Sequence, residues 1–316
     1  MIKLFHSVLL GSAVSVLLLL VSAAIGPADA QEAGDISQYA AAADPPLFDD
    51  PSAAVEAFKS TLSANDFDGL ARLLGLDASK LKKSEGGTET YALIREGASR
   101  QVVVQDLGDR KILEIGDRLW PLPFPIAKGQ DGKWAFDTYV GLEEIVNRLV
   151  GENENEAIES ARAYVEAQQD YAAEDRDGDG VLEYAQKLIS SESLMDGLYW
   201  PPDQGDGASP VGDAINEAAF EKARAGDGYF GYRFRILTSQ GDDIAGGKYD
   251  YVINGNMIAG FGLIAWPVKY AETGVKTFVV NQQGIVYETD LGPSTEAIVP
   301  FIDGFDPDDK WNVVAD

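Results

Sequence analysis

The order of the periodic segments is the feature that most constrains the fold of this 316-residue chain. Apolar residues at helical spacing predict a helix that begins at Asp50-Pro51, and a shorter helix is expected over 67–74. From Arg100 the period changes to about four short strands, separated by Gly-Asp and Asp-Gly turns. Helices followed by antiparallel strands indicate an α+β unit.

The second half of the chain repeats this order with a longer helix. Residues 141–172 have the strongest helical pattern in the chain. At spacings of three and four, one face of this helix carries Ile158, Ala161, Val165, Gln168 and Ala172. Short helices are expected over 182–189 and 214–225, followed by hairpins on Asn254-Gly255 and Gln283-Gly284. This pattern predicts a long helix on an antiparallel meander.

The N-terminus has the pattern of a secretory signal. Lys3 precedes an apolar run from Val8 to Val21, and Ala28-Asp29-Ala30 is a small-residue cleavage site. We expect cleavage after Ala30 and a periplasmic or secreted protein, without an integral membrane segment after cleavage. A retained anchor is the alternative, but no flanking basic cluster follows the apolar run.

The domain organisation follows from these segments and from the polar residues around Gly151. After the signal over 1–30 we expect a disordered linker over 31–47. An N-terminal α+β domain over 48–150 and a C-terminal α+β domain over 151–300 come next. The acidic tail over 301–316 is expected to be partly ordered through Trp311.

The charge is strongly negative, at −27, and removal of residues 1–30 leaves it unchanged. Such a charge repels phosphate backbones and anionic headgroups, so no nucleic-acid partner is expected and cations are the better candidates. Adaptation to high salt would produce the same composition.

The absence of two residue types excludes several chemistries. The chain has no cysteine, and its single histidine, His6, lies in the signal. A mature chain with neither residue cannot use Ser-His-Asp or Cys-His catalysis, ordinary zinc sites or thiol redox chemistry. A metal would therefore be a hard cation held by oxygens.

One acidic segment has the spacing of a calcium loop. An EF-hand-type loop has side-chain oxygens at its first, third and fifth positions, then glycine and a backbone carbonyl, and closes on a glutamate. The closing position is occupied by Gln186, but Glu183 could close a shortened loop. The candidate ligands are Asp175, Asp177, Asp179, Val181 and Glu183. A bare Asp/Gly turn is the alternative.

A second candidate site is an aromatic loop with two acids. Asp196 and Asp206 flank Tyr199 and Trp200, and an aromatic surface beside two carboxylates suits a sugar ring. This pattern favours a carboxylate-dependent hydrolase of a cell-wall or polysaccharide substrate. A proline-rich loop held in place by its aromatic residues is the simpler interpretation.

Several long strings carry a family resemblance. "WPLPFP", "GKWAFDT", "AIESARAYVEAQQDYA", "DGLYWP" and "GGKYDYVINGNMIAGFGLIAWPVKY" resemble the bacterial exported or envelope family catalogued as domain of unknown function 2950, in order from Phe48 to Trp311. The resemblance implies export and no assigned activity. Where that family has a basic run, this chain reads "NRLVGENENE" and keeps Arg148, Gly151 and Asn153-Glu154, so anion binding by that run is in doubt here.

Two weaker resemblances concern the fold. The C-terminal half is similar to the globular domain of type IV pilin-like and pseudopilin proteins, some of which bind calcium through an acidic loop. The N-terminal half looks like a cystatin or NTF2-like helix-plus-curved-sheet fold. Together these observations predict an exported, acidic, non-enzymatic protein that binds or scaffolds an envelope protein or polysaccharide and has a structural calcium loop.

Overall fold

The computed structural model describes residues 36–84, 86–176, 178–204, 207–212 and 215–315. The chain divides into two compact units, of which the first ends at Arg148 and the second begins at Leu149. The division falls inside helix α6 (Thr138–Tyr171). Each unit combines helices with an antiparallel sheet, which confirms the predicted α+β class. The cystatin-like and pilin-like assignments stay predictions.

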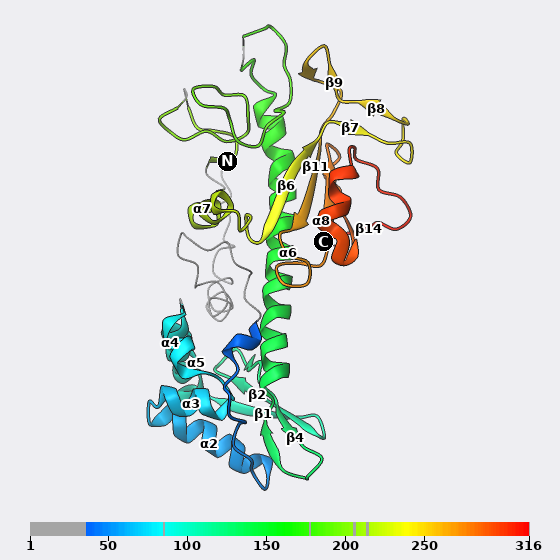
Figure 1. The fold of residues 1–316 in the computed structure, drawn as a ribbon. Helices are drawn as coiled ribbons and strands as arrows, with labels where there is room; N and C mark the ends of the chain where they lie inside the picture. Colours follow the sequence, from blue (N-terminus) through cyan, green and yellow to red (C-terminus); the bar gives the residue numbers. More distant parts are fainter. Residues whose placement is uncertain (1–35, 85, 177, 205–206, 213–214, 316) are drawn as a thin grey trace. The chain divides into compact units, whose positions relative to one another are not determined.

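The first unit consists of a helical group and a five-stranded sheet (Figure 1). Its helices are η1 (Ile36–Tyr39), α2 (Pro51–Ser63), α3 (Phe67–Leu73), α4 (Ala78–Lys83), α5 (Gly87–Arg100) and the start of α6. Its strands are β1 (Val102–Asp106), β2 (Arg110–Ile115), β3 (Trp120–Pro121), β4 (Ile126–Lys128) and β5 (Trp134–Phe136). The sheet order is β1-β2-β4-β5, and β3 pairs with β2.

Local signals explain where α2 begins. The Asp50 carboxylate accepts the N–H of Ala53 at 2.9 Å, and Pro51 occupies the first turn, where it needs no hydrogen-bond donor. The inner face of α2 buries Phe58, which contacts Phe136 of β5. Burial of such side chains joins the helices to the sheet. The two helices α4 and α5 were not anticipated from the sequence.

The segment before α2 differs from the expected disordered linker. Residues 36–39 form η1, and Tyr39 is only 8% exposed. Its carbonyl accepts the N–H of Asp77 at 2.8 Å. Tyr39 therefore belongs to the core of the first unit, whereas residues 31–35 and the signal lie outside the described residues.

The second unit contains the rest of α6 and a sheet in the order β14-β13-β12-β11-β6. The sheet strands are β6 (Tyr232–Leu237), β11 (Gly262–Pro267), β12 (Thr277–Asn281), β13 (Tyr287–Thr289) and β14 (Asn312–Val313). Two small pairs are β7 (Ser239–Gln240) with β8 (Tyr249–Asp250), and β9 (Val252–Ile253) with β10 (Asn256–Met257). The other helices are α7 (Glu217–Ala225), η3 (Gly292–Ser294), α8 (Thr295–Ile298) and η4 (Val299–Phe301).

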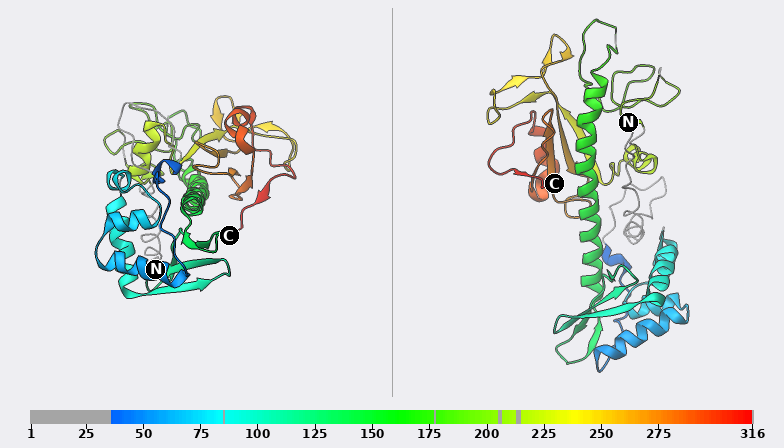
Figure 2. Two further views of the ribbon diagram at one scale, coloured as in Figure 1. Left: turned by 60° about the horizontal axis from the view of Figure 1, so that its bottom comes forward. Right: turned by 180° about the vertical axis from the view of Figure 1, so that it is seen from behind.

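Both faces of this sheet are covered. Leu263 and Ala265 of β11 join a core with Tyr164 of α6, whereas Ile264 points to a second core with Val299. Figure 2 shows α8 beside the sheet, and α7 on the side of α6 away from it. A strand that is covered on both faces is expected to be apolar along its whole length, and β11 has this composition.

The two predicted hairpin turns are confirmed, but one predicted helix is wrong. Asn254 and Gly255 both have positive φ, 53° and 98°, as a tight hairpin turn requires. β12 and β13 likewise pair across the Gln283-Gly284 turn. Residues 182–189 are not helical, because their backbone has distant partners such as the Met257 carbonyl, which accepts the Tyr184 N–H at 2.8 Å. The C-terminal tail is ordered through Trp311, and β14 pairs with β13.

Candidate functional site

The acidic loop after α6 folds around its first aspartate. The Asp175 carboxylate accepts the Gly178 N–H at 2.8 Å and the Gly180 N–H at 2.9 Å, one on each oxygen. Both glycines have positive φ, 78° and 87°, which glycine adopts without strain. The alternating glycines therefore let the loop backbone turn its N–H groups towards a single carboxylate.

The other described acids connect the loop to the hairpin β9–β10. Asp179 accepts the Val181 N–H at 2.7 Å and the side-chain amide of Asn256 at 2.7 Å. Glu183 accepts the Met257 N–H at 2.9 Å. A third connection runs from the Gln186 side chain to the Gly255 carbonyl at 2.7 Å. The predicted ligands Asp179 and Glu183 are thus held by one hairpin, which the sequence did not indicate.

The loop's single base is directed inward. The Arg176 side chain is 10% exposed, and its guanidinium lies 5.4 Å from the ring centres of both Tyr171 and Trp200. Its ion pair is with Glu174 at 3.2 Å. Contacts of one guanidinium with two aromatic rings anchor the loop. Arg176 therefore fastens the loop to the core of the second unit.

Val181 and Asp177 are the two remaining predicted metal ligands. Val181 contributes its N–H to Asp179, and its carbonyl is the predicted ligand atom. Asp177, the central aspartate, lies outside the described residues. Among the residues that are described, no three acidic side chains gather closely enough to hold a metal ion.

The aromatic loop places its residues in structural roles. Trp200 is 1% exposed, and its indole N–H donates to the Gly207 carbonyl at 3.4 Å. The Tyr199 ring contacts Phe220 of α7, with ring centres 4.9 Å apart. A tryptophan buried under Arg176 presents no open face to a sugar ring.

Asp196 is fully engaged by neighbours that the sequence did not single out. Its carboxylate accepts the Lys187 ammonium at 2.6 Å, the Ser191 N–H at 2.7 Å and the Ser191 hydroxyl at 3.0 Å. Burial opposes the charged form, but the hydrogen bonds from Lys187 and Ser191 prevail and lower the pKa of Asp196. A carboxyl with a lowered pKa is a poor general acid. Its proposed companion Asp206 lies outside the described residues, so the loop gives no support to the hydrolase.

Two residues of the run "NRLVGENENE", Asn153 and Glu154, have partners within the protein. The Asn153 amide donates to the Thr273 carbonyl at 2.9 Å, and one Glu154 oxygen accepts the N–H groups of Val275 and Lys276 at 2.8 and 2.9 Å. Both side chains fasten α6 to the turn before β12. Their role in this chain is therefore structural.

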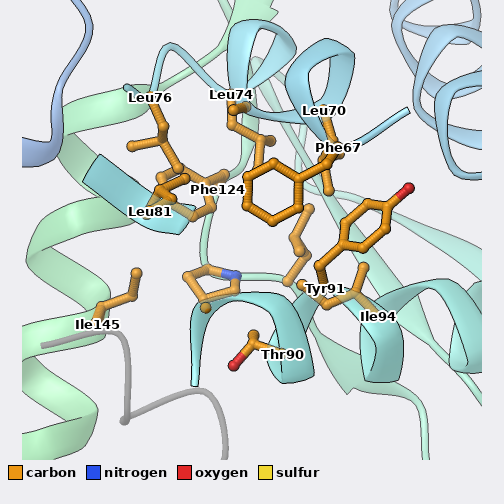
Figure 3. A pocket seen from close by; sticks show the side chains of 14 residues that line it. Phe67, Leu70, Leu74, Leu76, Leu81, Thr90, Tyr91, Ile94, Phe124 and Ile145 are labelled. Atoms are coloured by element: carbon orange, nitrogen blue, oxygen red, sulfur yellow. The ribbon is translucent and has the colours of Figure 1, made fainter. Parts of the chain in front are cut away.

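The first unit contains a small apolar cavity of about 50 Å³. Figure 3 shows Phe67, Leu70, Leu74 and Phe124 around it, while the Tyr91 hydroxyl points away from its centre. Pockets that bind small molecules usually measure about 300–1,000 Å³. This small cavity lies between α3, α4, α5, the start of α6 and the segment before β4, and it is well below that size.

Comparison with known proteins identifies one family. The family model described as "Protein of unknown function (DUF2950)" matches residues 46–314. No curated protein and no solved structure matches the chain. No helix among the described residues is long and apolar enough to cross a membrane.

Proposed function

We propose that this chain, which belongs to the DUF2950 family of proteins of unknown function, is an exported, non-enzymatic protein that binds or scaffolds an envelope protein or polysaccharide. The segment from Asp175 to Glu183 is proposed to be a structural calcium loop. The observation that carries the calcium proposal is the anchoring of this loop. The turn at Asp175 and the bonds of Asp179 and Glu183 to β9–β10 hold these three described carboxylates in defined positions, and Arg176 contacts Trp200 beneath the loop.

The charge of the second unit supports a cation. Residues 149–316 contain 31 acidic and 11 basic residues, a net charge of −20. Carboxylates close to one another in such a unit repel, and a divalent cation with oxygen ligands relieves that repulsion. Asp175, Asp177, Asp179 and Glu183 would supply carboxylate oxygens, and Val181 a carbonyl oxygen. Calcium would hold the loop and, through Asp179 and Glu183, the hairpin β9–β10.

The non-enzymatic role has separate support. The predicted mature chain contains neither histidine nor cysteine. The candidate acid Asp196 forms an ion pair with Lys187 at 2.6 Å. These features favour a protein that binds over one that catalyses, and the acidic surface favours a cationic region on its partner.

Calcium titration by calorimetry, with thermal melts in calcium and in EDTA, tests the site. Asp175→Asn and Asp179→Asn keep the side-chain shape and remove one charge each, and Asp44→Asn in the first unit is the control. We expect saturable binding and a melting temperature several degrees higher in calcium, since a ligand at one hundred times its Kd stabilises by about 2.7 kcal/mol. Both loop variants should lose the effect and the control should keep it. Absent heat, or binding that survives both loop variants, would overturn the calcium loop.

A further inference from the structure

Strand β1 lies at an edge of the first unit's sheet and is unpaired on its outer side within the described chain. The opposite edge is different. There, Phe48 pairs with Trp134 of β5 through two hydrogen bonds, 2.8 and 2.9 Å long. Among the described residues, the chain therefore covers one edge of this sheet and leaves the other uncovered. An uncovered edge is a template for another strand.

The pairing of β1 with β2 fixes which backbone groups face outward. Gln101 and Leu107 are bonded to β2 in the same register, through Gly116 N–H to the Gln101 carbonyl and Leu107 N–H to the Arg110 carbonyl, both at 2.9 Å. Bonded residues alternate along an antiparallel strand. The N–H and C=O groups of Val102, Val104 and Asp106 therefore point to the free edge.

The side chains along this edge are unusually apolar for an exposed position. Val104 is 42% exposed, and Leu107, directly after the strand, is 55% exposed. Edge strands are commonly protected by proline, lysine or a bulge, and β1 pairs with β2 over five consecutive residues without a break. Its single charged residue, Asp106, is bonded to Lys111 and to the Gly108 N–H. β1 thus has the features of a pairing strand without the usual protection.

The charge distribution identifies the occupant. A chain with a net charge of −27 repels a copy of itself over most of its surface. Residues 100–118, which contain β1 and β2, are an exception, because they carry four basic and four acidic residues. A second copy can approach here without net repulsion, whereas the second unit, at −20, opposes such an approach.

We propose that two copies of this protein associate by antiparallel pairing of β1 with β1 about a two-fold axis at Val104. The three outward residues are symmetric about Val104, so Val104 pairs with Val104 of the second copy and Val102 pairs with its Asp106. The same surface is used on both copies, so the contact closes as a dimer and does not continue into a fibre.

Sedimentation velocity of the purified protein over a range of micromolar concentrations tests the proposal. Val104→Pro removes an outward N–H at an edge position, where proline is tolerated. Val104→Lys keeps the backbone donor and places two like charges together at the axis. Val104→Thr keeps both the donor and the β preference and is the control.

We expect a concentration-dependent dimer for the wild type and for Val104→Thr, and association weakened at least about tenfold in Val104→Lys. Val104→Pro should be monomeric, with circular dichroism confirming that it is folded. Should Val104→Pro fail to fold, the result for Val104→Lys decides. A wild-type monomer at all concentrations, or a dimer that persists in Val104→Lys, overturns the proposal, and neither outcome bears on the calcium loop.

Discussion

The side-chain amide of Gln168 forms both hydrogen bonds with the backbone of Ala185, as donor to its carbonyl and as acceptor from its N–H, each at 2.8 Å. The same amide donates to the Tyr164 hydroxyl at 2.9 Å, and that hydroxyl donates to the Gly262 carbonyl at 3.0 Å. Gln168 is completely buried. One glutamine thus joins α6, the segment after the acidic loop and β11.

Replacement of Gln168 by leucine should destabilise the second unit by about 2–4 kcal/mol, because buried groups of Ala185 and Tyr164 lose their partners. The adjacent Gln169 is exposed, so Gln169→Leu is the matched control and should change stability by less than about 0.5 kcal/mol. Denaturant unfolding followed by circular dichroism measures both. Equal stability of the two variants would show that the network contributes nothing.

Two glycines of α6 should respond oppositely to alanine. A Cβ atom at Gly141 would lie 2.0 Å from the Phe124 ring, while at Gly151 no described atom beyond the neighbouring residues and the adjacent helix backbone lies within 4 Å of it. We expect Gly141→Ala to destabilise by about 1–3 kcal/mol through the clash. Gly151→Ala should stabilise by about 0.5–1 kcal/mol, since alanine is the better helix former. Thermal melts of the two variants measure both effects. A gain of stability in Gly141→Ala would show that the Phe124 ring does not exclude a side chain at position 141.

The ion pair of Asp196 should make part of the stability depend on pH. The pKa of Asp196 is lowered from 3.8 by Lys187 and Ser191 in spite of burial. A lowered pKa in the folded state gives stability that is complete above the unfolded value and is lost as the pH falls through the folded value. Asp196→Asn should therefore be less stable than the wild type by about 1 kcal/mol at pH 7.

The difference in stability between the wild type and Asp196→Asn should disappear once the pH falls below the pKa of Asp196 in the folded protein, which lies below 3.8. Unfolding curves from neutral to acidic pH measure it. Asp203→Asn, at an exposed position in the same loop, is the control and should follow the wild type. A deficit in Asp196→Asn that is unchanged at low pH would assign the role of Asp196 to packing instead of charge.

Elements with local causes were predictable. Asp50 caps the start of α2 by accepting the N–H of Ala53, three positions later in the chain. Asn254 and Gly255 supply the two positive φ angles of their own hairpin turn. The apolar stripe of the long helix correctly included Gln168. In each case the residues that cause the structure lie within a few positions of it, so the pattern can be read from a short window.

The candidate sites were less predictable. Asp196 was grouped with Trp200 and Asp206 because they are near in sequence, but its partners are Lys187 and Ser191. The acidic spacing marked the loop, yet nothing in that spacing identified Asn256 as the partner of Asp179, 77 positions away. Distant pairing also prevented the helix expected over 182–189.

The sequence by itself determined the mixed α+β class, the absence of histidine and cysteine chemistry from the predicted mature chain, the caps and the hairpin turns. Tertiary structure alone decided that Tyr39 enters the core, that Gln168 bonds to Ala185 and that Arg176 stacks on Trp200. The physical reason is that capping and turn formation depend on neighbouring residues. A buried polar group, by contrast, must find its partner wherever the folded chain brings one.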